Sequence, residues 1–279
     1  MKPKTWKKLQ KKILIYITVI IFTIWTLFPV YWMVKSSFTP NELMYTPKPS
    51  MIPEAWTVNH YKDLFQKTKF MNYVKNSLYV ASLVTLISVS ISILGSYSMT
   101  RLRYRGRVFF SQSIIYTYLL PTAVLFIPMY VAVSKLGLSD NKNALLIVYP
   151  TIIVPYCCYM LISYFKAIPK ELEEAAMIDG CSSLQSLFRI ILPIASPGIA
   201  VVSTFAFTLA WNEYLYALVL TTTPAQQTVN IGIAGFKFSD QAVWGLLMGS
   251  SVVASLPAIF LYFLAQRFLK SGLAAGGVK

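Results

Sequence analysis

The chain has 279 residues, of which 56% are hydrophobic and 13% are charged. This composition is too apolar for an ordinary soluble domain, and the apolar runs leave no stretch long enough for a separate soluble catalytic domain. The formal net charge of +15 is accounted for by basic loops beside anionic lipid headgroups, so we expect membrane lipid and no nucleic acid as a partner.

Six runs, uncharged except for Glu213 in the fifth, are long enough to cross a bilayer, whose core of roughly 30 Å needs about 20 helical residues. They predict an all-α, polytopic membrane protein with one core domain over residues 74–266. The predicted transmembrane helices are residues 13–34, 76–100, 108–134, 143–165, 193–220 and 241–266. The other segments are a basic N-terminus (1–12), external loops (35–75 and 221–240), a cytoplasmic segment (166–192) and a cytoplasmic tail (267–279).

Basic residues are distributed unevenly between the segments on the two sides of the membrane. With the N-terminus inside, most of the 25 lysines and arginines fall in cytoplasmic segments, so we expect both termini in the cytoplasm. The first apolar run exceeds the length of a signal-peptide core, and no small-x-small cleavage site follows it. We therefore expect this run to be kept as the first span.

Groups for catalysis or metal binding are scarce. His60 is the single histidine, Cys157 and Cys158 are neighbours within a span, and Cys181 lies in the next gap. No P-loop and no G-x-S-x-G motif occur. We expect no metal site, no bound cofactor, no catalytic residue and three reduced cysteines, and hence a protein that is not an enzyme.

Two spans carry stripes of small residues, which let helix backbones approach closely. Gly245 and Gly249 form a G-x-x-x-G pattern in the sixth span. The stripe in the second span comprises Ser88, Ser92, Gly95 and Ser96. Packing within the bundle or against a partner is favoured over the lining of a pathway.

The fifth predicted span contains an acidic residue in the sequence `AWNEYLY`. A carboxylate in a span costs about 3 kcal/mol, so Glu213 should face protein or a watery cavity. Together with Trp211, Asn212 and Tyr214 it suits a polar, ring-shaped solute such as a sugar. The alternative, which we favour, places Glu213 at the outer interface with the aromatic residues in an interfacial belt.

A hydrophilic segment separates the fourth and fifth spans and begins with `AIPKELEEAAMIDG`. Pro169 and the acids Glu171, Glu173 and Glu174 predict the start of a helix, and Gly180 predicts its left-handed end. Ser182 and Gln185 then form an S-x-x-Q capping box. The second helix has an apolar stripe of Leu184, Leu187, Phe188 and Ile191, and we expect Pro193 to hinge it to the fifth span.

This helix pair has the form of a docking lever, anchored at one end in the bilayer. Ala175 and Ala176 keep the first helix thin, so that a partner surface can close over it. The alternative is an amphipathic helix lying on the membrane, but its leading acids would be repelled by anionic headgroups.

The segment resembles the EAA loop of the permeases of ABC importers. The residues that match the pattern are Glu174, Ala175, Ala176, Gly180, Ile190, Leu192 and Pro193. Asp179 matches the sugar-transporting branch, whereas Cys181 stands where that branch has alanine. The pieces `FPVYWMVKSSF`, `WNEY` and `WGLLMGSSVVASLPAIF`, and the tail `SGLAAGGVK`, extend the resemblance over nearly the whole chain, to the smaller permease subunit of carbohydrate importers.

The resemblance implies a type I importer fold in a prokaryotic cell membrane, with a second, homologous permease subunit as a heterodimer. Two cytoplasmic ATP-binding subunits would hold ATP and Mg²⁺, and an external sugar-binding protein would deliver substrate. The residues implied to couple to the ATPase are Glu174, Ala175, Ala176, Met177, Asp179, Gly180, Leu184, Phe188, Leu192 and Pro193. Those implied to contact the binding protein, from the external loop over residues 221–241, are Thr228, Asn230, Gly232 and Gly235.

The sequence alone leaves two alternative functions possible. A secondary transporter driven by an ion gradient would need several charges inside its spans, and Glu213 is the one acid found there. A permease of the same superfamily could import an amino acid, phosphate or a metal ion instead of a sugar. The residues of the spans do not select between sugar and other neutral polar solutes.

Overall fold

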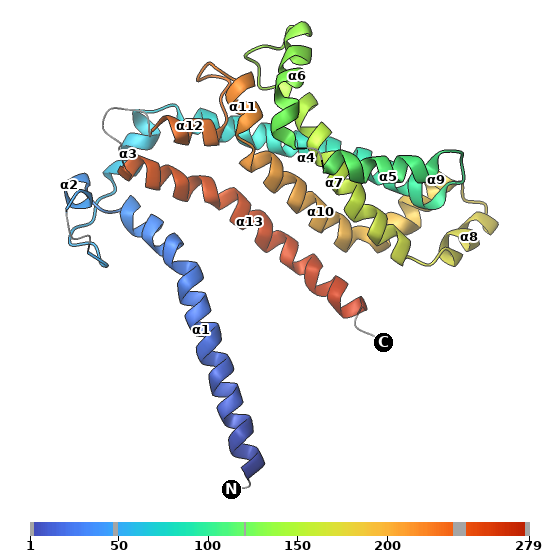
Figure 1. Cartoon of the computed structure of the whole chain (residues 1–279), viewed down its shortest axis with the longest axis horizontal. Coiled ribbons are helices and arrows are strands. Elements are labelled where there is room, and N and C mark those ends of the chain that lie inside the picture. Colours follow the sequence, from blue (N-terminus) through green and yellow to red (C-terminus); the bar gives the residue numbers. More distant parts are fainter. Residues whose placement is uncertain (1–2, 47–49, 120, 237–243, 277–279) are drawn as a thin grey trace. The chain divides into compact units, whose positions relative to one another are not determined.

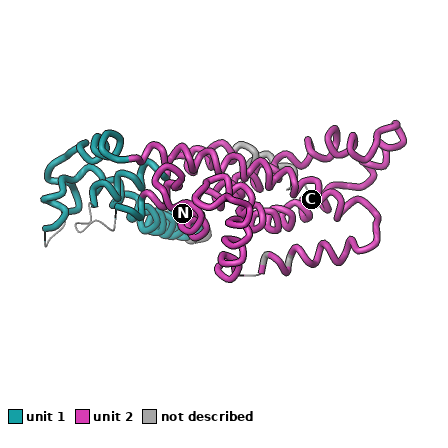
Figure 2. Tube along the Cα trace, turned by 90° about the horizontal axis from the view of Figure 1, so that it is seen from above, with its two compact units in different colours: residues 1–68, 233–254 teal, residues 69–232, 255–279 magenta. Residues whose placement is uncertain are grey.

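The computed structural model describes residues 3–46, 50–119, 121–236 and 244–276, and every regular element in these ranges is a helix (Figure 1). This confirms the predicted all-α class. The chain divides into two compact units (Figure 2), residues 1–68 with 233–254 and residues 69–232 with 255–279.

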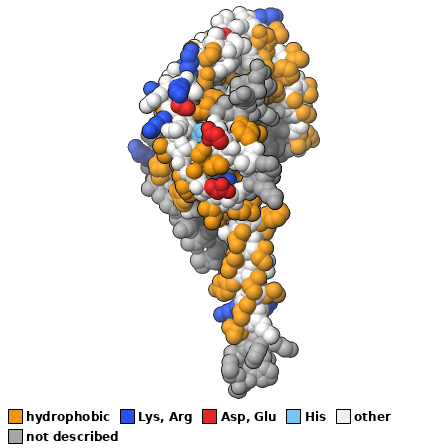
Figure 3. Space-filling model, turned by 90° about the vertical axis from the view of Figure 1, so that its left-hand side faces the viewer, with side chains coloured by type: hydrophobic (Ala, Val, Ile, Leu, Met, Phe, Trp, Pro, Cys, Tyr) orange, Lys and Arg blue, Asp and Glu red, His pale blue; other side chains and the backbone are white. Residues whose placement is uncertain are grey.

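Unit 1 begins with the long helix α1 (Pro3–Ser37), followed by the short helices α2 (Asn41–Met44) and α3 (Asn59–Gln66). None of the apolar window of α1 is buried within the chain, and Figure 3 shows hydrophobic side chains along its surface. A helix that is hydrophobic all round needs lipid or another subunit to cover it. The stretch predicted as the external loop 35–75 contains α2 and α3.

The C-terminal helix α13 (Trp244–Gly276) packs its first turns against α3. A Cβ on Gly245 would lie 2.2 Å from the buried His60 ring, whose Nε2 donates to the Thr39 carbonyl at 2.9 Å. A Cβ on Gly249 would lie no closer than 3.7 Å to the ring of Tyr61. The predicted G-x-x-x-G pair is therefore asymmetric, because only Gly245 is required for close approach.

Gly245→Ala is expected to destabilise the folded protein by about 1–3 kcal/mol, because the added methyl group must displace a buried and hydrogen-bonded ring. Gly249→Ala is the matched control, since its methyl group meets only ordinary van der Waals contacts. Thermal unfolding of the purified protein measures both. Equal shifts for the two variants would contradict this packing.

In unit 2 the helices α4 (Phe70–Arg101), α7 (Ala144–Ala167) and α10 (Leu192–Asn212) pack against one another. The small stripe of α4 faces α7, where Ser92 Oγ donates to the Val154 carbonyl at 3.3 Å and Ser96 Oγ to the Cys158 carbonyl at 3.2 Å. Both serines are fully buried. The stripe thus serves packing within the chain, which is the interpretation favoured from the sequence.

Five helices of the described chain are long and apolar enough to cross a membrane. They are Lys8–Ser37, Phe70–Arg101, Ala144–Ala167, Ser183–Asn212 and Trp244–Gln266. The remaining predicted span, residues 108–134, is not one helix, and this prediction is wrong as stated. It divides into α5 (Arg107–Tyr118) and the shorter α6 (Thr122–Lys135).

The break between α5 and α6 has a local cause. Pro121 has an extended ψ of 120° and precedes the first residue of α6. Proline has no N–H to donate and disfavours helical geometry in the residue before it, so a helix is readily interrupted at this point. The length of an apolar run does not show whether its backbone forms one continuous helix. For this reason the break could not be predicted from the sequence.

The fifth predicted span, 193–220, is also interrupted. Helix α10 ends at Asn212, Glu213 is extended with a ψ of 131°, and α11 (Leu215–Leu220) follows. The Glu213 carboxylate accepts hydrogen bonds from the N–H groups of Tyr216 at 3.0 Å and Ala217 at 3.2 Å. These N–H groups begin a new helix and have no partner of their own within it, so the carboxylate stabilises the break.

Candidate functional site

The hydrophilic segment between α7 and α10 folds into a short helix, a bend and a second helix. The first helix is α8 (Glu171–Ile178), with Glu171, Glu173 and Glu174 in its first turn, where they meet the positive end of the helix dipole. Gly180 has a φ of +89°, as predicted for the left-handed end. The N–H of Cys181 donates to the Ala176 carbonyl at 2.9 Å, and that of Gly180 donates to the Met177 carbonyl at 3.1 Å, which completes a Schellman motif.

The second helix starts at the predicted capping box. The Ser182 N–H donates to Gln185 Oε1 at 2.8 Å, and the Gln185 N–H donates to Ser182 Oγ at 3.3 Å. Helix α9 (Ser183–Ser186) continues through a π-helical turn η1 (Leu187–Ile191) into α10 without a break. Pro193 lies at the start of α10, directly after the π-turn, and its role as a hinge stays a prediction.

The predicted apolar stripe divides between two faces. Leu187 and Ile191 are fully buried in a cluster with Tyr97 and Phe165, and Leu192 packs on its edge. In contrast, Leu184 and Phe188 are each 59% exposed. The second helix therefore attaches to the bundle by one face and presents an apolar face outward.

The exposed apolar surface continues onto α8. On that helix the exposed apolar side chains are Leu172, Met177 and Ile178, and Ile178 is 87% exposed. Glu174, Ala175, Asp179 and Gly180 are also exposed, as is Pro193. Ala176 is buried, so this residue of the predicted coupling set packs inward. The rest of α8 presents acidic and apolar groups side by side, which is the composition of a protein-binding surface.

The clamp, formed by Tyr97, Arg101 and Glu173, holds α8 to the end of α4. Glu173 is only 5% exposed, and its carboxylate accepts a hydrogen bond from the Tyr97 hydroxyl. Arg101 Nε lies 3.4 Å from Glu173 Oε2, the distance of an ion pair without a hydrogen bond. The Tyr97 hydroxyl also lies 3.0 Å from the Ser183 carbonyl, so the clamp reaches the start of α9.

Arg101 also joins α4 to α7. Its Nη2 donates to the carbonyls of Phe165 at 2.8 Å and Ile168 at 2.7 Å, at the end of α7. One guanidinium thus fixes the end of one span and the acidic residue of α8 together. The sequence analysis missed this role, although Glu173 lies three residues before the buried Ala176 and therefore on the same face of α8.

The four residues predicted for a substrate pathway do not share one site. Trp211 is buried and stacks on Phe207 with ring centroids 5.7 Å apart, and its carbonyl accepts from Asn230 Nδ2 at 2.8 Å. Tyr214 is partly exposed and does not line the cavity that contains its two neighbours. The four-residue pathway therefore stays a prediction, of which this cavity brings together Asn212 and Glu213.

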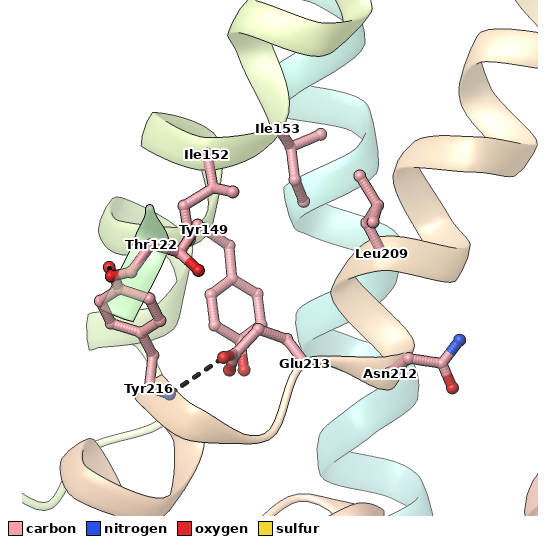
Figure 4. Close-up of a pocket in the computed structure, with 8 residues that line it drawn as sticks. All are labelled: Thr122, Tyr149, Ile152, Ile153, Leu209, Asn212, Glu213 and Tyr216. Carbon is pink, nitrogen blue, oxygen red and sulfur yellow. Dashed lines mark hydrogen bonds between the residues drawn. The ribbon is translucent and has the colours of Figure 1, made fainter. Parts of the chain in front are cut away.

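Asn212 and Glu213 line one cavity of about 260 Å³ (Figure 4). Its other lining residues are Thr122, Tyr149, Ile152, Ile153, Leu209 and Tyr216. In Figure 4 the Tyr149 ring points toward the Glu213 carboxylate, which already caps α11. Glu213 thus faces protein and a polar corner of a mostly apolar cavity, in agreement with the expectation that it avoids lipid.

The predicted external loop after α11 is held by side chains from two other segments, the start of α4 and the α6–α7 connection. Asn76 Nδ2 donates to the carbonyls of Ala225 and Gln227, both at 2.9 Å, and Lys142 Nζ donates to Asn76 Oδ1 at 2.8 Å. Ser77 Oγ accepts from the Val229 N–H at 2.8 Å. The first half of this loop therefore packs on the start of α4 and on the connection that leads into α7.

This packing changes the set of residues predicted to contact a binding protein. Thr228 is buried, and a Cβ on Gly232 of α12 (Val229–Gly235) would lie 2.1 Å from the Tyr73 ring. Asn230 is half-buried, and Gly235 is exposed. Of the four, Gly235 and part of Asn230 therefore stay at the surface, while residues 237–241 of the predicted loop lie outside the described residues.

Asp140 ties the loop to the α6–α7 connection. Its Oδ1 accepts from the N–H groups of Thr222 and Thr223, both at 2.8 Å, and these bonds lower the pKa of the carboxyl below its usual value of 3.8. The folded protein favours the anionic form of Asp140. The two hydrogen bonds therefore support the loop in full at pH values above 3.8. The support is lost as the pH falls through the lowered pKa.

Asp140→Ala is expected to speed hydrogen exchange of the Thr222 and Thr223 amides at neutral pH, because both lose their acceptor. Asp63→Ala, which removes an exposed ion pair with Lys67 on α3, is the control and should leave these amides unchanged. Exchange measured by mass spectrometry tests this. Unchanged protection in the Asp140 variant would show that other contacts hold the loop.

The fold and this site together define a class: a multi-pass helical membrane permease with a docking segment held between two of its spans. The family of binding-protein-dependent transport system inner membrane components matches residues 91–274. The chain belongs to this family, as its resemblance to importer permeases predicted.

Several relatives match over almost their whole length. The inner membrane ABC transporter permease protein YcjP of Escherichia coli is 37% identical over 277 residues, 99% of each chain. The trehalose/maltose transport system permease protein MalG of Thermococcus litoralis is 34% identical, covering 98% of this chain and 99% of the relative. The diacetylchitobiose uptake system permease protein DasC of Streptomyces coelicolor is 34% identical, with 94% and 95% covered.

A solved structure shares the fold. It is a bacterial ABC transporter involved in the import of the acidic polysaccharide alginate, with a TM-score of 0.79 at 20% identity. The match covers 94% of this chain and 97% of that chain. The importer permease fold with its multi-pass membrane arrangement is thus confirmed.

Proposed function

We propose that the chain is the transmembrane subunit of an ATP-driven, binding-protein-dependent importer of sugars, in particular oligosaccharides. The observation that carries the proposal is the segment from α8 to α10, which presents an acidic and apolar surface while the clamp fixes its other side. A partner that moves this surface moves α4 and α7 with it, since Arg101 binds all three elements.

The names of the relatives support the substrate class. Those that are 34% identical are permeases for trehalose and maltose, for diacetylchitobiose and for sulfoquinovosyl glycerol. All of these solutes carry sugar rings. They favour a carbohydrate over an amino acid, phosphate or a metal ion as the solute of this chain.

In this proposal the energy comes from other subunits. Two cytoplasmic ATP-binding subunits hold ATP and Mg²⁺ and close over Glu174, Asp179, Gly180 and the exposed side chains of Leu184 and Phe188. The permease itself catalyses no reaction. Both termini are cytoplasmic, as the distribution of basic residues indicates.

The remaining proposed partners are assigned to surfaces that this chain leaves exposed. The uncovered apolar face of α1 suits a second, homologous permease subunit together with lipid. An external sugar-binding protein, of the kind seen with the alginate transporter, would dock near Gly235. Only Asn212 and Glu213 stay in the proposed pathway, and the partner permease makes most contacts with the sugar.

ATP hydrolysis by the purified complex tests the proposal. Addition of the binding protein loaded with trehalose, maltose or diacetylchitobiose should raise the rate above that with the empty binding protein. A binding protein loaded with an amino acid should not. Uptake that needs an ion gradient and proceeds without ATP would instead support a secondary transporter and overturn the proposal.

A further inference from the structure

A basic cleft lies at the end of the bundle where α4 gives way to α5. Its lining residues are Arg103, Tyr104, Gly106, Arg107, Val108, Phe109 and Lys170, around a volume of about 500 Å³. Three of these side chains are cationic, and no acid lines the cleft in the described part of the chain. The clamp and the exposed surface of α8 do not include any of these side chains.

The backbone turn brings the cations together. Gly106 has a φ of +89°, and the chain reverses there between Arg103 and Arg107. Arg107 Nη1 donates to the Leu102 carbonyl at 3.2 Å, which keeps its guanidinium beside the loop. Lys170, the residue before α8, supplies the third charge from the other side of the cleft.

An apolar surface begins directly beside these charges. Val108, Phe109 and Phe110 are 63%, 69% and 55% exposed on the first turn of α5. Tyr104 adds an amphipathic ring of the kind that lies at the level of lipid headgroups. Cations beside exposed aromatic and aliphatic groups, at the ends of two membrane helices, match an amphiphile with an anionic head.

We propose that this cleft binds the headgroup of an anionic phospholipid from the leaflet on the side of α8. The phosphodiester lies between Arg103, Arg107 and Lys170, where guanidinium groups donate paired hydrogen bonds to phosphate oxygens. The acyl chains run along Val108 and Phe109. The bound headgroup joins the α4–α5 loop to the residue that starts α8.

A free anion such as phosphate or a nucleotide would satisfy the charges but not the apolar rim. A protein partner would cover the cleft without needing lipid. The lipid is favoured because the cleft lies beside the ends of α4 and α7, two helices that are long and apolar enough to cross a membrane, and because its rim is apolar and exposed.

The test is a lipid titration of the purified permease, with its copurifying subunits, in neutral detergent, followed by native mass spectrometry. The probes are phosphatidylglycerol, phosphatidylcholine and inorganic phosphate. The variant R103Q/R107Q/K170Q removes the three cations. The matched control K8Q/K11Q/K12Q removes the same charge from three exposed positions of α1.

We expect one phosphatidylglycerol to bind tightly, and the site variant to lose affinity by roughly 5-fold for each cation removed. The control variant should keep this binding, and phosphatidylcholine should not compete. Equal losses in both variants would mean only a general surface potential and would overturn the proposal. So would competition by inorganic phosphate, or phosphatidylglycerol binding only after the copurifying subunits are removed.

Arg107 also bonds to the backbone, so the triple variant could unfold. The variant R103Q/K170Q is then the decisive one, because both of its side chains are exposed and make no ion pair among the described residues. It should still lose affinity for phosphatidylglycerol, by roughly 25-fold on the same scale. Unchanged affinity in a folded double variant would overturn the proposal.

Discussion

Glu173→Ala is expected to abolish transport and to lower the free energy of unfolding by about 3–5 kcal/mol, the range for breaking a buried ion pair. The variant leaves the Arg101 guanidinium buried without its carboxylate, and the Tyr97 hydroxyl loses its acceptor. Helix α8 then loses its only charged attachment to α4 among the described residues. Solute uptake in membrane vesicles and thermal unfolding of the purified protein measure the two effects.

Glu174→Ala is the matched control, since it removes the neighbouring acid of the same helix from an exposed position. It should cost little stability, within about 0.5 kcal/mol, yet reduce uptake if that face binds the ATPase. The two adjacent acids therefore have separable roles. Equal stability in the two variants would show that the clamp does not hold α8.

Arg101→Lys refines this prediction. A lysine keeps the positive charge but cannot donate as a fork to both the Phe165 and Ile168 carbonyls while it faces Glu173. We expect stability between that of the wild type and that of Glu173→Ala. Coupling, measured as solute transported per ATP hydrolysed, should fall more than stability does. A merely structural role for Arg101 would lower both together.

The segment between the fourth and fifth spans was the most predictable part of the chain. Its signals are local: the left-handed Gly180 and the reciprocal bonds of Ser182 and Gln185 each depend on residues close in sequence. The burial of Glu173 was not predictable in this way, because it depends on Arg101 and Tyr97, which lie on a distant helix. Local caps can be read from a sequence, but the partner of a buried charge cannot.

The two helix breaks show a different limit of prediction from the sequence. Both predicted spans had the length and apolarity of a helix, and the breaks occur at Pro121 and Glu213. Proline can interrupt or merely bend an apolar helix, and only its neighbours decide between the two. Glu213 was read as a polar residue seeking a partner, which is correct, but its partners are the free N–H groups of α11.

The external loop shows the effect of tertiary contacts on a predicted binding surface. Glycines, threonines and amides between two spans are typical of an exposed loop. Here Asn76, Ser77, Asp140 and Lys142 take up its backbone groups, so Thr228 becomes buried. Two of the four residues predicted to contact a binding protein, Thr228 and Gly232, are accordingly buried.

Gly180→Val is expected to abolish ATP-coupled uptake while leaving membrane insertion intact. A β-branched residue at a φ of +89° is strained by roughly 1–3 kcal/mol, although no atom lies within 4 Å of the position. The strain is relieved by changing the bend, which re-aims the exposed face of α8 relative to Leu184 and Phe188. Because an added Cβ at this position meets nothing within the chain, we expect the loss of function to arise from the surface offered to the ATPase.

Gly137→Val is the matched control, because Gly137 also has a positive φ, +71°, and no atom within 4 Å, but lies in the α6–α7 connection. Both variants should lose similar stability in thermal unfolding. Only Gly180→Val should lose uptake and the stimulation of ATP hydrolysis by the loaded binding protein. If both variants lost uptake equally, strain alone would explain the loss. If Gly180→Val kept uptake, the bend would have no part in coupling, and the surface contacted by the ATPase would have to lie elsewhere.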